Sequence, residues 1–414
     1  MASVELFFFY LFGAAAPLSL AALNAGLVGL ALFFLWRLLK GKYRPGVSEW
    51  ILIAFIAWNA VSALSGPMPA KALYGVMNYW SWSALFIAAA LPSAIRRQWR
   101  RFSAFLALSA ALTFPISFCT FAIGTNFRRS RLLSHRPIGT VCSFGFFSHH
   151  LTYAGAMILV VSVTAALTLY GGRRRAWWSL AAFASFLNLL LSQARGYYLA
   201  AIPTAAVLLW KKGKKWVLTV GTAAIVASAL LLAVGPASIR NRVKSTFDLG
   251  NASNAERIYL WISGFQMVKD RPVAGWGPGI YKDTAGPYKA PYAGLIHYPT
   301  HTGFQTVSHA HNLFLMVAIQ SGIIGLLLFL AFIVAAFRGM LRQENRALRF
   351  GAMAALTAFL VGGLFEFNGG DAEVAMLVFF LVGLALRNVE SGRGATGMDD
   401  AGLDHGSGPK NHLE

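Results

Sequence analysis

The chain has 414 residues, of which 57% are hydrophobic and 12% are charged, and its formal net charge is +21. A soluble domain carries about a quarter charged residues, so this composition excludes an ordinary soluble protein. Apolar runs of about 20 residues recur along the chain, long enough to cross a bilayer as helices, whereas segments of about ten residues with alternating polarity, typical of a membrane β-barrel, are missing. We therefore predict an all-α polytopic membrane protein. Its excess cations are expected in cytoplasmic loops rather than at a nucleic-acid interface.

About twelve transmembrane helices are predicted. In chain order the apolar spans cover 5–21, 23–38, 50–66, 73–92, 102–123, 151–170, 176–191, 196–210, 216–234, 311–337, 347–365 and 372–387. The first lacks a basic n-region, so we expect a transmembrane helix rather than a cleaved signal peptide. The chain then divides into helices one to nine (1–234), a large loop (235–310), helices ten to twelve (311–388) and a Gly-rich polar tail (389–414) that is expected to be disordered.

Every second connection between the spans is basic. The basic segments are 37–44, 96–101, 171–175, 211–215 and 337–349. Because Lys and Arg collect in cytoplasmic loops, these connections and both termini are predicted to lie in the cytoplasm. The alternate connections then face outward.

Two outward connections are long, 124–150 and 235–310. The first contains four arginines on the side where the charge rule expects few cations; they are Arg128, Arg129, Arg131 and Arg136. Two interpretations stay open for them. They bind a phosphate-bearing ligand, or they extend from a helix end to the membrane surface.

A tight outward turn carries Arg195, within "LLLSQARGYYLAA" (189–201). An arginine at such a reversal, next to lipid, is costly unless it is paired or functional. The structural alternatives are that Arg195 caps helix carbonyls or pairs with Glu366.

The long loop contains one predicted amphipathic helix. Asn254 is its expected N-cap, and apolar residues recur at helical spacing up to about Lys269. Its expected apolar stripe, which would rest on the membrane surface or on the bundle, is Ile258, Trp261, Ile262, Phe265 and Val268. "DRPVAGWGPG" ends the helix with a run of breakers. Arg257 falls in the first turn beside Glu256, and its position alone favours a solvated residue.

Four histidines close the loop: His297, His301, His309 and His311. Imidazoles are common metal ligands, but residues 235–310 offer only four carboxylates and no ordered spacing such as HExxH. The two cysteines, Cys119 and Cys142, are too few for a cysteine-based site, and a bridge between them is not predicted. We therefore predict no metal ion. A structural role for His311, with its ring bonded to backbone, remains the alternative.

Outward arginines and a histidine, without metal, suit a pyrophosphate leaving group. Guanidinium groups bind it in a bidentate manner and stabilise the charge that develops as the bond to the anomeric carbon breaks. The accepting hydroxyl must lose a proton, and histidine has a pKa suited to general-base work. A lipid-linked sugar donor would explain why such a site lies in a membrane protein.

Four segments are similar to the O-antigen ligase (WaaL) branch of the O-antigen ligase/polymerase superfamily. They are "QARGYYLA" (193–200), "AERIYLW" through "PVAGWGPGIY" (255–281), "HAHNLFLMVAIQSGIIGLLLFL" (309–330) and "LFEFNGGDAEVAML" (364–377). The resemblance covers most of the chain, best from about 190 to 385. The HNxxL segment followed by GxxG is typical of the superfamily and does not separate its branches.

This resemblance implies a GT-C-like membrane fold and an inverting, metal-independent glycosyltransferase that needs no cofactor. It implies transfer of a polysaccharide from undecaprenyl diphosphate to a lipid A–core sugar hydroxyl. The reaction would take place on the periplasmic face of the bacterial inner membrane, where membrane lipids surround the protein.

The resemblance also implies roles for single residues. The family's two essential arginines match Arg195 and Arg257, which would hold the diphosphate, and its histidine followed by Asn312 matches His311, the expected general base. His309 departs from the plainest form of the motif and receives no role of its own beyond a share in binding. The remaining substrate-binding candidates are Glu366 and Asp371, which would orient an arginine or the acceptor, and, on a looser match, Arg128, Arg129 and Arg136.

Three other functions remain open. An O-antigen polymerase usually has two sizeable outer loops, and 124–150 is modest beside 235–310. A protein O-oligosaccharyltransferase usually extends further at the C-terminus. A transporter would place ionisable residues near the membrane midplane, whereas the polar candidates here collect on one face. The ligase is the favoured reading.

Overall fold

The computed structural model describes residues 2–123, 142–172, 174–213, 251–295 and 307–388, with isolated positions between 215 and 248. These residues form helices and their connections and contain no β-strand, which confirms the all-α class. The predicted span 216–234 lies largely outside the described residues, as does the predicted tail.

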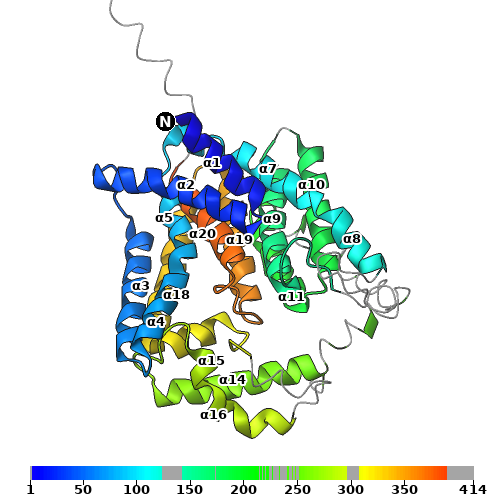
Figure 1. Ribbon diagram of the computed structural model, residues 1–414. Coiled ribbons are helices and arrows are strands. Elements are labelled where there is room, and N and C mark those ends of the chain that lie inside the picture. The colour runs from blue at the N-terminus through cyan, green and yellow to red at the C-terminus, as the bar shows by residue number, and fades with distance from the viewer. Residues whose placement is uncertain are drawn as a thin grey trace, which may run out of the picture.

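The first half of the chain forms a helical bundle with short connections (Figure 1). Its elements are α1 (Ala2–Ala15), α2 (Leu20–Leu39), α3 (Val47–Ser65), α4 (Pro69–Val76), the 3-10 helix η1 (Met77–Ser83), α5 (Ala84–Ala89), α6 (Ser93–Arg96), α7 (Trp99–Leu112), α8 (Phe114–Ile123), α9 (His150–Tyr170), α10 (Arg175–Leu191) and α11 (Arg195–Leu209).

The second half adds a helical layer at one end of the bundle and then returns to the core. Its elements are α14 (Ala252–Asp270), α15 (Tyr281–Thr284), α16 (Gly286–Lys289), the 3-10 helix η3 (Ala290–Leu295), α18 (Leu313–Leu341), α19 (Arg346–Gly362) and α20 (Ala372–Ala385). Helix α20 lies in the middle of the core, where every residue from Val374 to Ala385 is buried.

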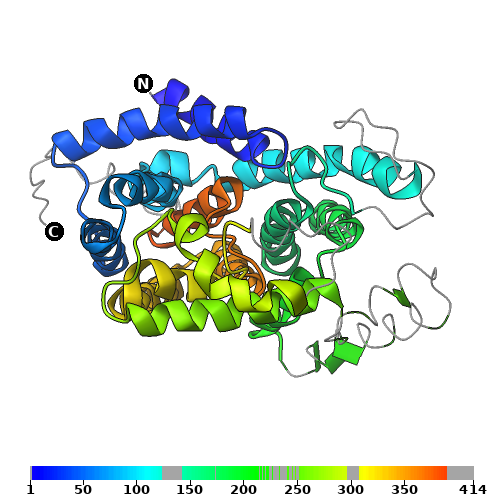
Figure 2. The same cartoon turned by 60° about the horizontal axis from the view of Figure 1, so that its bottom comes forward.

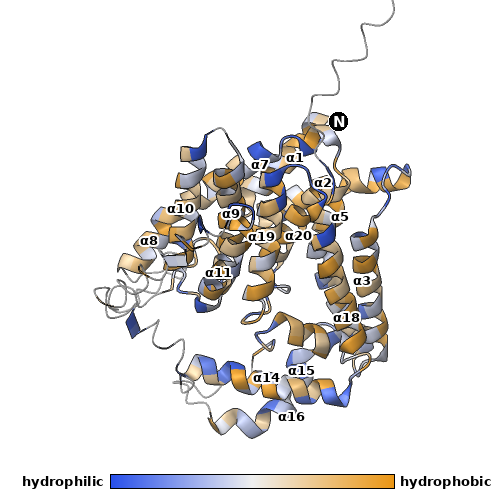
Figure 3. Cartoon of the chain, turned by 180° about the vertical axis from the view of Figure 1, so that it is seen from behind, coloured by the Kyte–Doolittle hydropathy of each residue, from blue (hydrophilic) through white to orange (hydrophobic). Residues whose placement is uncertain are grey.

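Five described segments are long and apolar enough to cross a membrane: Leu20–Leu39, Val47–Ser65, Trp99–Ala122, His150–Tyr170 and Leu313–Leu341. Helices α1, α10 and α20 are apolar but shorter. Large apolar side chains cover the outside of α2 and α3, including Leu32, Trp50 and Leu64, which are 58% to 65% exposed. Figure 3 shows hydrophobic colour along α3 and α18, against mixed colour over α14 and α16. The chain is a membrane protein, and the count of twelve spans stays a prediction.

Two predicted spans have different boundaries in the structure. Helix α1 ends at Ala15, because Pro17 follows and Ser19 begins α2 by accepting a hydrogen bond from Ala22 N. The predicted span 102–123 is divided into α7 and α8 at Thr113, two residues before Pro115. Proline cannot donate the helical hydrogen bond at its position, so the break follows from the sequence.

The basic connections gather at one end of the bundle. Arg387, just after α20, donates to Glu49 Oε1 at 2.7 Å and to Arg44 O at 3.0 Å, and Lys212 lies 4.9 Å from the ring centre of Tyr170. The connection before α3 therefore meets the end of α20, and the connections after α9 and after α11 meet each other. The alternating charges predict that the basic connections share one end, and the side of the membrane on which they lie stays a prediction.

The layer of α14 to α16 covers the opposite end. Figures 1 and 2 both show α14 running across that end of the bundle. Arg271 donates to Ser65 O at 3.0 Å, and Lys71 pairs with Asp283 at 2.7 Å. The long loop is thus fixed to the α3–α4 connection as well as to α18.

Helix α18 is broken at Gly322, and the loop after α14 fills the break. Gly322 has φ 64° and ψ −168°, outside the helical region. Trp276 N donates to Ile319 O at 2.8 Å, Gly277 N donates to Gln320 O at 2.9 Å, and Ile323 N donates to Pro272 O at 2.8 Å. Non-helical backbone inside a membrane protein must find such partners. "PVAGWGPG" therefore does more than end α14, because it also completes α18.

The predicted N-cap of α14 is wrong, and its predicted apolar stripe is right only in part, since Trp261 and Val268 pack against the buried cluster around Met267. The N-cap is Asn251, whose side chain accepts from Ser253 N, and Asn254 lies inside the first turn. The buried face passes through Gly264 and Met267, while Phe265 is 60% exposed. The reason is the small residue: Gly264 lies against Leu315 and Ile319 of α18, and a residue without a side chain lets two helices approach closely.

Candidate functional site

The turn between α19 and α20, residues 363–371, is where the candidate segments meet. Its backbone carbonyls accept four hydrogen bonds from three elements, namely α18 with its N-cap, α14 and η1. They are Leu313 N to Gly363 O (2.6 Å), Asn312 Nδ2 to Leu364 O (3.1 Å), Arg257 Nε to Phe365 O (3.2 Å) and Trp82 Nε1 to Gly369 O (3.1 Å). Polar groups buried at helix ends need such partners. The site is therefore organised around the turn's own backbone.

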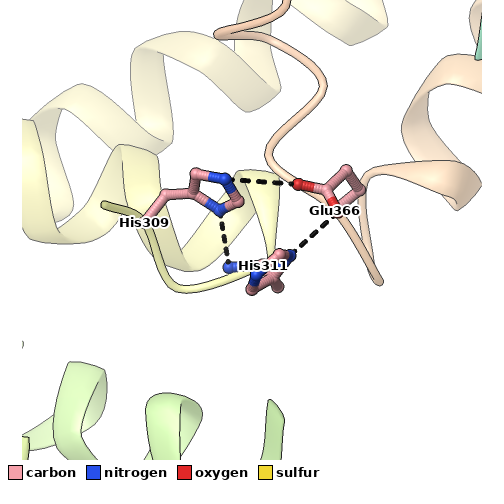
Figure 4. Close-up of side chains that lie close together, drawn as sticks. All are labelled: His309, His311 and Glu366. Carbon is pink, nitrogen blue, oxygen red and sulfur yellow. Dashed lines mark hydrogen bonds and ion pairs between the residues drawn. The ribbon is translucent and has the colours of Figure 1, made fainter. Parts of the chain in front are cut away.

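His311 and Glu366 form the central pair, shown in Figure 4. His311 Nδ1 lies 2.8 Å from Glu366 Oε2, and their side chains are 18% and 7% exposed. His311 has φ 47°, a left-handed conformation that is rare for residues other than glycine. Directly after it, Asn312 caps α18 by accepting from Leu315 N at 2.9 Å. The side chain of Asn312, predicted to bind substrate, thus holds the helix and the turn together.

The protonation state of Glu366 determines which nitrogen of His311 carries the proton. Burial raises the pKa of Glu366, but the hydrogen bond and charge of His311, with the charges of His309 and Arg257, lower it overall to about 2. An ionised carboxylate only accepts hydrogen bonds, so Nδ1 of His311 is the donor. Nε2 is then the nitrogen that can accept a proton, as a general base must.

His309 lies beside this pair. Its Nε2 is 3.6 Å from Glu366 Oε1, its Nδ1 accepts from His311 N at 3.3 Å, and the two imidazole ring centres are 4.2 Å apart. Burial lowers the pKa of His309 to about 4; Glu366 opposes the shift, while His311, His149 and Arg257 add to it. His309 is therefore neutral near pH 7.

The two arginines approach the same turn from different helices. Arg257 on α14 donates through Nε to Phe365 O and through Nη1 to Ser253 Oγ at 2.7 Å. Arg195 begins α11, and the next residue, Gly196, packs so closely against Phe365 that a Cβ there would lie 2.8 Å from the phenylalanine Cβ. The structure therefore brings both predicted arginines to the turn that carries Glu366.

Arg195 also ties α11 to the start of α14. Its Nη1 donates to Ser245 O at 2.5 Å and to Ser245 Oγ at 3.0 Å, and its Nη2 donates to Asn254 Oδ1 at 3.0 Å. These are neutral oxygen acceptors, in contrast to the Glu366 pairing considered from the sequence. The carboxylate of Glu366 is held by the histidines instead.

Residues 180–330 match the family model described as O-antigen ligase. Over these residues the chain is similar to the O-antigen ligase family. The match contains Arg195, Arg257, His309 and His311, and it ends before Glu366. Members of this family are glycosyltransferase-like enzymes, ligases and polymerases, and the match does not distinguish between them. No protein among the curated sequences matches the chain.

Asp371 is a second carboxyl group near Glu366 and the candidate base. Burial raises its pKa well above the usual value, and the nearby charges of Glu366 and Glu373 raise it further, against a hydrogen bond from Thr152. The pKa values of Glu366 and Asp371 are thus shifted in opposite directions. Environments that push two carboxyl groups apart in this way give them different roles.

Two residues near the site were missed by the sequence reasoning. His149 is the N-cap of α9 and lies close enough to His309 to lower its pKa. Lys289 is fully buried and donates to Val307 O at 3.2 Å, two residues before His309. His149 directly precedes an apolar run, as His311 does. Lys289 carried no such signal.

The remaining candidates are not among the residues that the structure places at this site. Arg128, Arg129, Arg131, Arg136, His297 and His301 lie outside the described residues. Cys119 and Cys142 form no disulfide bond.

A largely apolar cavity of about 880 Å³ lies beside the site. It is lined by the α1–α2 connection, by α8 and by residues 145–148, with Glu373 at its edge. Ser148 precedes His149, and Glu373 follows the turn 363–371 by two residues. The cavity therefore adjoins the candidate site without including its histidines or arginines.

Proposed function

We propose that the protein is an O-antigen ligase. It transfers a polysaccharide from undecaprenyl diphosphate to a sugar hydroxyl of lipid A–core, with inversion at the anomeric carbon and without a metal ion. The observation that carries this proposal is the His311–Glu366 pair on a turn that also binds Arg257 and packs against the residue after Arg195. A general base and two guanidinium groups on one small surface are what transfer from a diphosphate requires.

The reaction proceeds by direct displacement. The acceptor hydroxyl oxygen attacks the anomeric carbon, while the bond from that carbon to the diphosphate oxygen breaks and its electron pair leaves with the diphosphate. Nε2 of His311 takes the hydroxyl proton. The imidazolium that forms keeps its Nδ1–H on Glu366, 2.8 Å away, so the carboxylate stabilises the positive charge as it appears.

The arginines bind the leaving group. Arg195 and Arg257 donate to neutral oxygens of Ser245, Asn254, Ser253 and Phe365. Phosphate oxygens are better acceptors for a guanidinium, because the hydrogen bonds are then charge-assisted and bidentate. Helices α11 and α18 also begin at this surface, and the positive ends of helix dipoles favour an anion there.

The cavity beside the site suits the hydrocarbon chain of the donor. Its lining is mostly apolar, and it adjoins His149 and the turn 363–371 rather than the arginines. With the lipid chain bound in the cavity, the diphosphate would be able to contact the arginines. This placement gives the cavity a role in donor affinity rather than in chemistry.

The proposal extends to the topology. The basic connections lie at one end of the bundle and the candidate site lies at the other. If the basic end is cytoplasmic, as the charge rule requires, the site faces the periplasm and both termini lie inside. The division into 1–234, 235–310, 311–388 and 389–414 belongs to the same proposal.

The test is transfer by the purified protein from a defined undecaprenyl diphosphate glycan to lipid A–core in detergent. Wild-type protein is expected to modify lipid A–core, and His311→Ala is expected to lose transfer at normal protein level. His405→Ala, in the tail, is the matched control. Glycan found only on lipid-linked glycan would make the protein a polymerase, and glycan on Ser or Thr of a protein would make it an oligosaccharyltransferase. Near-normal transfer by His311→Ala would remove the base assignment.

A further inference from the structure

Three donor atoms at the candidate base also form a metal-binding set. His309, His311 and Glu366 each offer one ligand atom, and these atoms lie within 4.8 Å of one another. Two imidazoles and one carboxylate are a common protein ligand set for Zn²⁺, with a position left for water. The sequence reasoning counted carboxylates only within 235–310 and so missed Glu366, which comes from the turn between α19 and α20.

We propose that His309, His311 and Glu366 bind one Zn²⁺ ion, and that the bound ion inhibits the enzyme. Binding is a property of these three residues alone. Inhibition rests on the proposed function, because it follows from the role of His311 as the base. The two parts are therefore measured separately.

The donors are held in place before any ion arrives. His311 Nδ1 is 2.8 Å from Glu366 Oε2, and His309 Nε2 is 3.6 Å from Glu366 Oε1. Ligands about 2.0–2.2 Å from a tetrahedral zinc are roughly 3.3 Å apart. To bind one ion, His311 Nδ1 and Glu366 Oε2 must move apart by about half an ångström. The two ligand atoms that lie furthest from each other must approach by more than that. Side-chain rotation can supply both movements. The histidine side chains are 26% and 18% exposed, so an ion can reach them.

Protons are exchanged when the ion binds. His311 carries its proton on Nδ1, directed at Glu366, and a metal needs that nitrogen unprotonated. The ion displaces this proton, and the imidazole that stays neutral carries its single proton on Nε2. On His309 the proton moves from Nε2 to Nδ1, at the expense of the 3.3 Å contact with His311 N.

Inhibition follows from the new position of the proton on His311. With Nδ1 on the metal and a hydrogen on Nε2, the ring has no lone pair left to accept the proton of the acceptor hydroxyl. Glu366 is also occupied and no longer stabilises an imidazolium. The ion thus removes both members of the pair at once, which agrees with a transfer reaction that uses no metal.

The binding test uses purified full-length protein in detergent, stripped with EDTA and dialysed, and Zn²⁺ alone titrated in competition with a chromophoric zinc chelator. One equivalent is expected to bind. His309→Asn and Glu366→Gln are each expected to weaken affinity at least tenfold. His150→Asn, which changes a histidine whose ring centre lies 4.5 Å from that of His149, is the matched control and is expected to keep affinity within about twofold.

A second pair of measurements separates the two parts of the proposal. Transfer is measured with and without saturating Zn²⁺ within each variant, so only the ratio is compared. At least tenfold inhibition is expected for wild-type protein and for His150→Asn, and little inhibition for His309→Asn. His309→Gln provides a second substitution if His309→Asn does not fold, judged by its thermal transition.

Equal zinc affinity in wild-type protein, His309→Asn and Glu366→Gln would overturn the site. Tight binding at these residues with unchanged or increased transfer would overturn inhibition. Loss of transfer after EDTA, restored by Zn²⁺, would overturn inhibition together with the metal-independent mechanism. If instead His311→Ala still transfers, the base assignment fails and the inhibition argument fails with it, while the zinc affinities still decide the site.

Discussion

Replacing Glu366 with glutamine should disable His311 as a base by moving its proton from Nδ1 to Nε2. Glu366 Oε1 accepts a hydrogen bond from Phe367 N at 3.0 Å, while Oε2 faces His311 Nδ1 at 2.8 Å. In Glu366→Gln, the amide oxygen must stay with the backbone N–H, so the amide NH₂ faces His311. Nδ1 then has to accept, the proton moves to Nε2, and the base is lost.

The size of the effect can be bounded from the structure. The lowering of the Glu366 pKa from 4.5 to about 2 means that its surroundings stabilise the ionised carboxylate, relative to the protonated acid, by about 3 kcal/mol. A charge-assisted hydrogen bond alone, at about 1.5–3 kcal/mol, would cost about 10- to 150-fold in kcat. The wrong tautomer costs more, about 10⁴-fold when the equivalent carboxylate of a serine protease becomes an amide. We expect a loss of at least 10³-fold.

The assay is steady-state transfer at saturating acceptor and varied concentrations of lipid-linked donor, from which kcat and the KM for the donor are obtained separately. Glu366→Gln is expected to lower kcat and leave KM for the donor within about threefold. Asp283→Asn is the matched control, since it removes a carboxylate that pairs with Lys71 at the same end of the molecule. A loss of less than about fivefold in kcat, or a change confined to KM, would refute the tautomer argument and place Glu366 in binding instead.

Three further predictions follow from other parts of the structure. Arg257→Lys keeps the charge but cannot reproduce the two-sided contact to the turn and to α14, so kcat should fall by about 10- to 100-fold, measured by the same assay. Gly322→Ala places a side chain at φ 64° against a backbone carbonyl. It should lower the free energy of unfolding by at least about 1–3 kcal/mol, the strain of such a conformation, seen as a lower midpoint of thermal unfolding in detergent. Gly213→Ala, at φ 89° in open space, is its control and should destabilise the protein less. The pKa of His309 is about 4 in the folded protein and near 6.5 when unfolded. The unfolded chain therefore binds the extra proton, and stability should fall as pH decreases from about 6.5 to 4, by up to about 3 kcal/mol; His309→Asn should flatten this part of the profile, and an unchanged profile would contradict it.

The helical class and the list of interacting segments could be predicted from the sequence. Apolar runs of bilayer length give the class, and alternating basic connections give the two ends, because both depend only on local composition. Contacts within the long loop could not be predicted in the same way. The buried face of α14 depends on the close packing of Gly264 against α18. A search for apolar side chains at helical spacing does not count a glycine, so it does not find this face.

The partners of the candidate residues were the least predictable part. His311 was selected from its own neighbourhood, but its carboxylate partner is 55 residues further along the chain. Asn254, expected to cap a helix, receives a hydrogen bond from Arg195 on α11. Such pairs depend on how the turn 363–371 sits between α11, α14 and α18. The packing of helices that are far apart in the sequence sets that placement, so residue spacing does not predict it.

The position of His309 explains how one turn can serve catalysis and still be open to inhibition. His311 adopts a left-handed backbone, which carries a strain of about 1–3 kcal/mol for a residue other than glycine. Its N–H is directed at His309 Nδ1, and both rings point their remaining N–H groups at one carboxylate. A polar neighbour that accepts this N–H and shares the carboxylate helps to offset that strain. Any residue able to do both must bring a nitrogen close to Glu366, and a second imidazole in that place completes a zinc ligand set. The same contact that fixes the base therefore makes it accessible to a divalent cation.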